Sequence, residues 1–139
     1  MISYNSENDF QLNNDAEISS WIESVILEEN FKLGEINYIF CNDDYLLKLN
    51  LEFLEHDTLT DIISFDYTVG KMIQGDIYIS TERVEDNAKD FNVSFNEELH
   101  RVMVHGVLHY CGYKDKSSDE ELLMREKENY YLQLLANKQ

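Results

Sequence analysis

Two histidines four residues apart, His105 and His109, are the side chains of this sequence best spaced for metal chemistry. Residues at i and i+4 lie one above the other on a helix, so both imidazoles can reach one ion. Gly112 follows at a spacing where helices often end in a left-handed residue, and the turn can bring Asp115 to the same point. The sequence therefore predicts a metal held by His105, His109 and Asp115, with the fourth position of a tetrahedral ion open to water, as in catalytic zinc sites.

The spacing H-x3-H-x2-G-x2-D also limits the kind of hydrolase. An isolated H-x3-H pair is common on helices without any metal, but the metzincin pattern places its third ligand at the same offset after the same glycine. In H-E-x-x-H proteases the residue after the first histidine is the general base. Here that residue is Gly106, which has no side chain. Peptidase chemistry of this type therefore lacks its base.

Three segments of the chain resemble the YbeY family of metal-dependent endoribonucleases. Residues 105–113 read H-G-V-L-H-Y-C-G-Y and are similar to the family signature. Residues 60–65 resemble its T-D-V-L-S-F block, and residues 75–80 resemble its G-D-I-x-I-S block. The resemblance covers nearly the whole chain. It implies a single-strand-specific endoribonuclease that acts in ribosomal RNA maturation and ribosome assembly, with ribosomal components as partners.

The predicted third ligand departs from the family pattern. Many members have histidine in a G-Y-D-H segment, whereas residues 112–115 read G-Y-K-D here. The carboxylate of Asp115 is an accepted zinc ligand. An oxygen ligand also favours harder ions. We expect one Zn²⁺ per chain, with Mn²⁺ or another divalent ion as a credible alternative.

A second departure concerns the cation that would hold a phosphate. Family members often carry arginine seven positions before the aspartate of the T-D block, and Leu54 stands there in this chain. An arginine beside a metal can stabilise the negative charge that develops on a phosphodiester, and leucine cannot. Either catalysis is weakened or another cation substitutes. The candidates from the sequence are Lys71, Arg83, Lys114 and Lys116.

Two functions other than RNA cleavage stay open at this point. The chain could be a weakly or non-catalytic ribosome-assembly factor in which a metal fixes the loop after Gly112. It could also hydrolyse a small phosphoester or amide. A basic funnel leading to the metal would favour RNA, and a closed apolar pocket would favour a small substrate.

The charge of the chain argues against nonspecific binding to nucleic acid. The formal net charge is −17, and residues 1–70 hold two basic side chains against fifteen acidic ones. Residues 71–139 hold nine against thirteen, so basic residues could gather near the histidines or be scattered over the surface. No apolar run approaches a membrane span, and Cys41 and Cys111 are isolated. We expect a cytoplasmic protein with reduced thiols and with neither DNA nor a membrane as partner.

The periodicity of apolar residues predicts one α+β domain over residues 1–139. The expected order is strand, helix, strand, helix, strand, strand, helix, helix, helix, with an edge strand in 1–12. Further strands are expected at 35–41, 62–67 and 72–79, and helices near 15–30, 44–51, 80–90, 94–110 and 120–136. The strands of 61–79 must be antiparallel because their connection is too short for a crossover. The expected fold is a mixed sheet with helices and a central metal-binding helix, a zincin-like arrangement.

Several other polar residues have more than one interpretation. Asp61 and Asp76 begin the two family-like strand segments, and each could accept hydrogen bonds from backbone amides or orient a ligand histidine. His56 and His100 have no supporting pattern and are expected at the surface or in loops.

Overall fold

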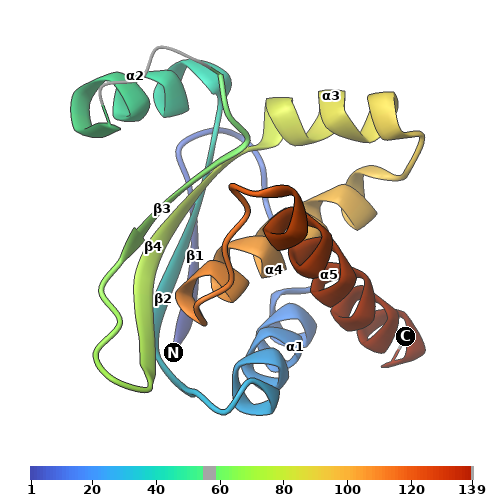
Figure 1. The fold of residues 1–139 in the computed structure, drawn as a ribbon. Helices are drawn as coiled ribbons and strands as arrows, with labels where there is room; N and C mark the ends of the chain where they lie inside the picture. The colour runs from blue at the N-terminus through green and yellow to red at the C-terminus, as the bar shows by residue number, and fades with distance from the viewer. Residues whose placement is uncertain (55–58, 139) are drawn as a thin grey trace.

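The computed structural model describes residues 1–54 and 59–138, which form a four-stranded sheet surrounded by five helices (Figure 1). The strands are β1 (Ile2–Ser6), β2 (Lys32–Cys41), β3 (Ile62–Asp66) and β4 (Met72–Ser80). The helices are α1 (Asp15–Glu28), α2 (Asp43–Leu54), α3 (Thr81–Phe91), α4 (Phe95–Tyr110) and α5 (Ser118–Lys138). Among the described helices, none combines the length and the apolar character that crossing a membrane requires.

The sheet is mixed, as the sequence predicts. Its strand order is β1-β2-β4-β3. β1 pairs parallel with β2 and β2 pairs parallel with β4, whereas β3 and β4 form the expected antiparallel pair. β1 lies at an edge, also as expected. The α+β class and the order of the elements are therefore confirmed.

The two faces of the sheet are covered by different helices. Side chains alternate along a strand, so Ile77 and Ile79 of β4 point into the main core with α1 and α4. Ile63 of β3 points to the opposite face and packs with Leu46 of α2. The helix with the two histidines, α4, lies between the sheet and α5 (Figure 1).

The surroundings of α4 explain one wrong prediction. His100 was expected at the surface, but it is buried and its ring lies edge-on to Trp21, with 6.0 Å between the ring centroids. The sequence suggests one apolar face, whereas α4 contacts the sheet, α1, α3 and α5. Burial lowers the pKa of His100, so this histidine is a neutral core residue. His56 lies outside the described residues.

Two boundaries also differ from the prediction. β2 begins at Lys32, earlier than the expected start at 35, and includes Gly34; the register of β2 with β4 shifts between Leu33 and Ile36. α5 begins at Ser118, earlier than the expected start near 120. Ser117 caps this helix: its Oγ accepts from the Glu120 backbone N–H at 3.2 Å, and the Glu120 carboxylate accepts from the Ser117 N–H at 2.9 Å.

Candidate metal centre

α4 is fixed at its start by a cap and along its length by close contact with the sheet. The Ser94 side chain accepts a hydrogen bond from the Glu97 backbone N–H at 3.1 Å, which is a helix N-cap. At Gly106, an added Cβ would lie 3.0 Å from Cδ1 of Ile62 and 3.1 Å from Cδ1 of Ile77. Position 106 therefore faces the sheet, and glycine lets α4 approach it closely.

The end of α4 is a Schellman turn. The Tyr113 N–H donates to the Leu108 carbonyl at 3.1 Å, and the Gly112 N–H donates to the His109 carbonyl at 3.0 Å. Gly112 has φ of +102°, a backbone conformation that residues other than glycine rarely adopt. The predicted left-handed glycine is thus present, and the chain after it returns toward the histidines.

The turn brings three ligand atoms together. Nε2 of His105 lies 2.9 Å from Nε2 of His109. Oδ2 of Asp115 lies 3.2 Å and 3.3 Å from these two nitrogens. Ligand atoms around a tetrahedral zinc with bonds of about 2.1 Å are about 3.4 Å apart. The three atoms therefore have nearly the mutual spacing that one ion would require.

Hydrogen bonds at the other ring nitrogens fix both tautomers. Nδ1 of His109 lies 2.9 Å from the Tyr113 carbonyl oxygen, which can only accept, so Nδ1 carries the proton. Nδ1 of His105 lies 2.7 Å from Oε2 of Glu128 and donates to it in the same way. In the neutral rings both Nε2 atoms are then unprotonated, and their lone pairs face each other. A cation between them removes this repulsion, so the residues fit a divalent metal.

Charge around His105 also favours a cation. Burial opposes the charged imidazolium, but the hydrogen bond and charge of Glu128 and the charge of Asp115 outweigh burial and raise the pKa of His105. Burial similarly opposes the Glu128 carboxylate, yet its bonds from His105 and Arg101 lower its pKa. Glu128 is therefore ionised and acts as the acceptor for His105.

Glu128 is a functional residue that the sequence did not reveal. Its side chain is 6% exposed, and its second oxygen, Oε1, accepts from Nη1 of Arg101 at 3.0 Å. Glu128 lies on α5, 23 residues from His105. No spacing rule links positions so far apart, and its helix has many other acidic residues.

Tyr113, whose carbonyl holds His109, is itself anchored by its phenol. The Tyr113 hydroxyl donates to Glu29 at 2.7 Å. Glu29 follows α1 and also accepts from the Tyr131 hydroxyl and, at 3.2 Å, from Nζ of Lys127, both on α5. Burial opposes the Glu29 carboxylate, but these three donors lower its pKa. The loop after α4 is thus tied to α1 and α5.

Replacing Gly112 with valine tests this turn. The new Cβ would meet nothing within 4 Å, so the strain comes from φ alone and should cost about 1 kcal/mol or more of unfolding free energy. It should also displace Asp115 and weaken metal binding, measured by calorimetric titration with Zn²⁺. Gly70→Val is the matched control, because Gly70 also has a positive φ, +59°, in an open turn of the β3–β4 hairpin. We expect it to lose stability but keep wild-type metal affinity. A folded Gly112→Val protein with wild-type affinity would contradict the role of the turn.

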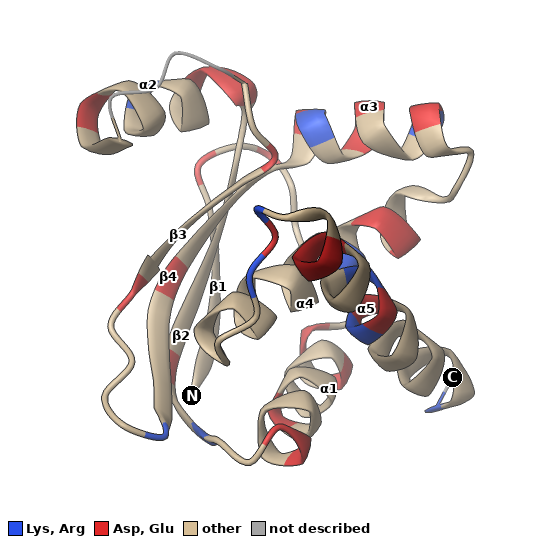
Figure 2. Cartoon of the chain, viewed as in Figure 1, with Lys and Arg blue, Asp and Glu red and all other residues tan. Residues whose placement is uncertain are grey.

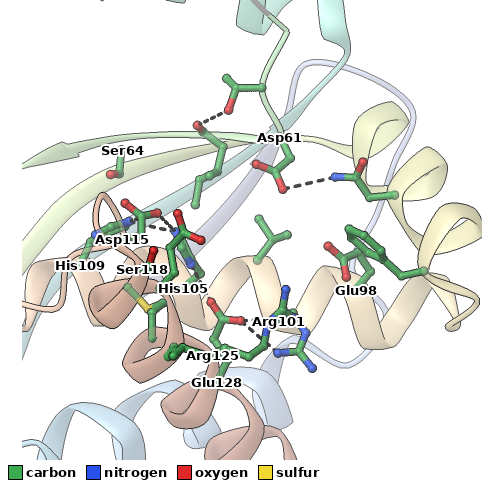
Figure 3. Close-up of a pocket in the computed structure, with 18 residues that line it drawn as sticks. Asp61, Ser64, Glu98, Arg101, His105, His109, Asp115, Ser118, Arg125 and Glu128 are labelled. Carbon is green, nitrogen blue, oxygen red and sulfur yellow. Dashed lines mark hydrogen bonds and ion pairs between the residues drawn. The ribbon is translucent and has the colours of Figure 1, made fainter.

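The three ligand atoms open onto a cavity of about 900 Å³ between β3, α3, α4 and α5 (Figure 3). Figure 3 shows Asp61 on one side of this cavity and Arg101, Arg125 and Glu128 on the other. The lining is neither a basic funnel nor a closed apolar pocket. Its charged residues are Asp61, Glu98, Arg101, Asp115, Glu121, Arg125 and Glu128.

The cations proposed from the sequence lie elsewhere among the described residues. Arg83 pairs with Asp43 at 2.7 Å, and Nζ of Lys71 lies over the Phe31 ring. Lys114 and Lys116 flank Asp115 in the loop before α5, where Figure 2 shows the alternation of basic and acidic positions, but neither lines the cavity. Leu54 ends α2, is exposed and does not line the cavity either.

Asp61 and Asp76 have different environments. Oδ1 of Asp76 accepts from the Asn37 side chain at 2.9 Å across β2 and β4, away from the cavity. Asp61 lines the cavity, and burial raises its pKa. Its Oδ2 has a long 3.5 Å hydrogen bond from Asn87. Neither carboxylate has a hydrogen bond to a ligand histidine, because Glu128 has that position at His105 and the Tyr113 carbonyl has it at His109.

Comparison with known proteins identifies the family of the chain. A family model described as Endoribonuclease YbeY matches residues 2–136. The chain belongs to the YbeY family. Membership confirms the resemblance seen in the three sequence segments. The protein that carries the His105–Asp115 segment is therefore a member of a family of endoribonucleases.

Similar proteins match over most or all of the chain. A protein of Flavobacterium psychrophilum named Endoribonuclease YbeY is 62% identical over 139 residues, which covers 100% of this chain and 99% of that protein. A protein of Flavobacterium johnsoniae with the same name is 64% identical over 129 residues, covering 93% of each. The solution structure of TM1509 from Thermotoga maritima has a TM-score of 0.71 at 27% identity, and the match covers 99% of this chain and 91% of that one.

Proposed function

We propose that this chain is a metal-dependent endoribonuclease that cleaves single-stranded RNA. Membership of the YbeY family makes it a hydrolase that acts on RNA. The observation that supports metal dependence is the set of three ligand atoms, all within 3.3 Å of one another, at the mouth of a charged cavity. The proposal includes one domain over residues 1–139, ribosomal RNA maturation, ribosomal components as partners and a cytoplasmic location.

Each residue at the centre has a separate task in this proposal. His105, His109 and Asp115 would hold one ion, Zn²⁺ or, because of the carboxylate, Mn²⁺. Such an ion lowers the pKa of water and polarises a phosphodiester. Glu128 and the Tyr113 carbonyl keep the two Nε2 lone pairs directed at one point. Binding then costs little reorganisation of the ligands.

Arg125 is the cation best placed to hold the substrate phosphate. Its side chain lines the cavity and is 54% exposed, and its Nη1 lies 3.8 Å from Oε1 of Glu128. Arg101, by contrast, is committed to Glu128 and Asn129 at 3.0 Å and 2.9 Å. We propose that Arg125 takes the role that arginine at position 54 would have in other members of the family.

The direct test is cleavage of a labelled single-stranded RNA by the purified protein, followed on a denaturing gel. The reaction is run with Zn²⁺, with Mn²⁺ and with a chelator, beside the same sequence annealed to its complement. We expect cleavage of the single strand only, and only with a metal. Equal cleavage in the chelator would contradict metal dependence, and failure with both ions would contradict the proposed activity.

Replacing Leu54 with arginine should leave the cleavage rate within about twofold of wild type. The physical reason is position: Leu54 is exposed at the end of α2 and does not line the cavity, so we expect that a new guanidinium there does not contact the substrate beside the metal ligands. Rates and melting temperature are measured together, with Lys48→Arg on the same helix as the control for a surface arginine. A rate increase of about tenfold, equivalent to ~1.4 kcal/mol, would instead show that position 54 limits catalysis.

A further inference from the structure

An exposed aromatic ring lies on the wall of the same cavity. Phe91, the last residue of α3, is 57% exposed, lines the cavity and packs in neither hydrophobic cluster of the described residues. Asn87, one turn earlier, also lines the cavity, and its amide makes the long 3.5 Å bond to Asp61. Residues four apart share one face of a helix. α3 therefore presents a flat apolar ring and an amide to the cavity.

The ring lies at a definite place relative to the metal centre. α3 ends at Phe91 and α4 begins at Phe95, so the ring is near the start of α4. Glu98, at that end of α4, is seven residues before His105, which is about 10 Å along a helix. Figure 3 shows Glu98 and the metal-binding side chains at opposite ends of the cavity. Stacked bases of one strand are about 3.4 Å apart, so this end is about three bases from the metal centre.

We propose that Phe91 stacks on an unpaired base of the RNA substrate. The nearby side-chain amide of Asn87 then hydrogen-bonds the edge of that base, and Arg125 contacts a phosphate between the base and the metal centre. The inference rests on the proposed endoribonuclease function and adds to it a second contact site for the strand. A ring can stack on any base, because every base has a π-face. It needs a base whose face is free, which a duplex does not offer.

Charge explains why stacking matters in this protein. Proteins that bind nucleic acid usually gain affinity from many phosphate contacts. Here the net charge is −17, and the basic residues among the described cavity lining are Arg101 and Arg125. Arg101 is already paired with Glu128. A neutral contact such as stacking therefore supplies affinity that the charges do not.

The test measures binding of a fluorescein-labelled single-stranded RNA by anisotropy, with EDTA present so that no cleavage occurs. Phe91→Ala should bind at least about fivefold more weakly than wild type. Phe91→Trp should keep wild-type affinity because it keeps a flat ring, whereas Phe91→Leu, apolar but not flat, should bind like the alanine variant. Tyr67→Ala is the matched control, since Tyr67 is also 57% exposed and does not line the cavity. It should bind like wild type.

Salt separates stacking from charge contacts. The ratio of wild-type to Phe91→Ala affinity should be the same at low and high salt, because stacking involves no ion release. The ratio of wild-type to Arg125→Ala affinity should fall as salt rises. Melting temperatures of all variants show that each is folded.

Three results would overturn the inference. Wild-type affinity in Phe91→Ala would mean that the ring contacts something other than RNA, such as a protein. Equal loss in Phe91→Leu and Phe91→Trp would mean that shape, not stacking, matters. No binding by the wild type in EDTA would exclude the contact site, since neither stacking nor Arg125 needs the ion. Cleavage by the wild type with metal is measured in parallel: cleavage without a Phe91 effect refutes only this inference, whereas absence of both cleavage and binding refutes the proposed function as well.

Discussion

Replacing Asp115 with alanine should lower the affinity for Zn²⁺ by at least about a hundredfold and remove detectable RNA cleavage. The side chain supplies one of the three ligand atoms that lie together among the described residues, and it is the one that brings negative charge to two neutral imidazoles. Loss of a residue that merely orients a ligand already costs about 10- to 100-fold in affinity, so loss of a ligand should cost more. Calorimetric titration with Zn²⁺ and the cleavage assay measure the two effects.

Two further variants make this result specific to the ligand. Asp115→His restores a ligand of the kind found in many family members and should bind Zn²⁺ well but bind Mn²⁺ more weakly than the wild type does. Asp119→Ala removes an exposed acid from the first turn of α5, outside the cavity lining, and should change neither measurement. Retention of wild-type zinc affinity by a folded Asp115→Ala protein would exclude Asp115 as a ligand.

Replacing Glu128 with glutamine should lower metal affinity by about 10- to 100-fold, although Glu128 is not a proposed ligand. The glutamate accepts from His105 with one oxygen and from Arg101 with the other. Glutamine has one acceptor oxygen, so either His105 loses the bond that fixes its tautomer or Arg101 loses its partner. Both outcomes weaken the alignment of the His105 Nε2 atom.

The stability of the same variant gives a second readout. The Arg101–Glu128 pair is nearly buried, with side-chain exposures of 16% and 6%, and removing one charge of such a pair is destabilising. We therefore expect a lower melting temperature even in EDTA. Glu121→Gln is the control, because Glu121 is on the same helix and lines the cavity but is exposed. Equal zinc affinities for wild type, Glu121→Gln and Glu128→Gln would exclude the orienting role.

The parts of the fold that local sequence determines were predictable. The order of elements follows from apolar periodicity, and the antiparallel β3–β4 pair follows from the shortness of its loop. The exact start of α5 could not be predicted. Ser117 and Ser118 are each followed three residues later by glutamate, so both match the pattern of a helix-capping box. The burial of His100 was missed because periodicity describes one face of a helix and not the number of neighbours around it.

The candidate site divides in the same way. His105, His109 and Asp115 lie within eleven residues, so the helix repeat and the Gly112 turn suffice to bring them together. Glu128 and Arg125 reach the cavity only because α5 packs across α4, which no local pattern reveals. The cations predicted from the sequence, Lys71, Arg83, Lys114 and Lys116, therefore did not include Arg125, which lines the cavity.

The anchoring of Tyr113 to Glu29 and Tyr131 has a consequence for the order in which the protein becomes competent. During synthesis the ligand residues are made before α5, yet Glu128 and Tyr131 belong to that last helix. A growing chain thus contains the histidines before it contains the groups that align them. Alignment requires the first and last helices to be docked on the same loop. A chain made only as far as the Asp115 loop would therefore leave the two histidines poorly aligned, and its metal affinity should be lower than that of a chain that includes α5.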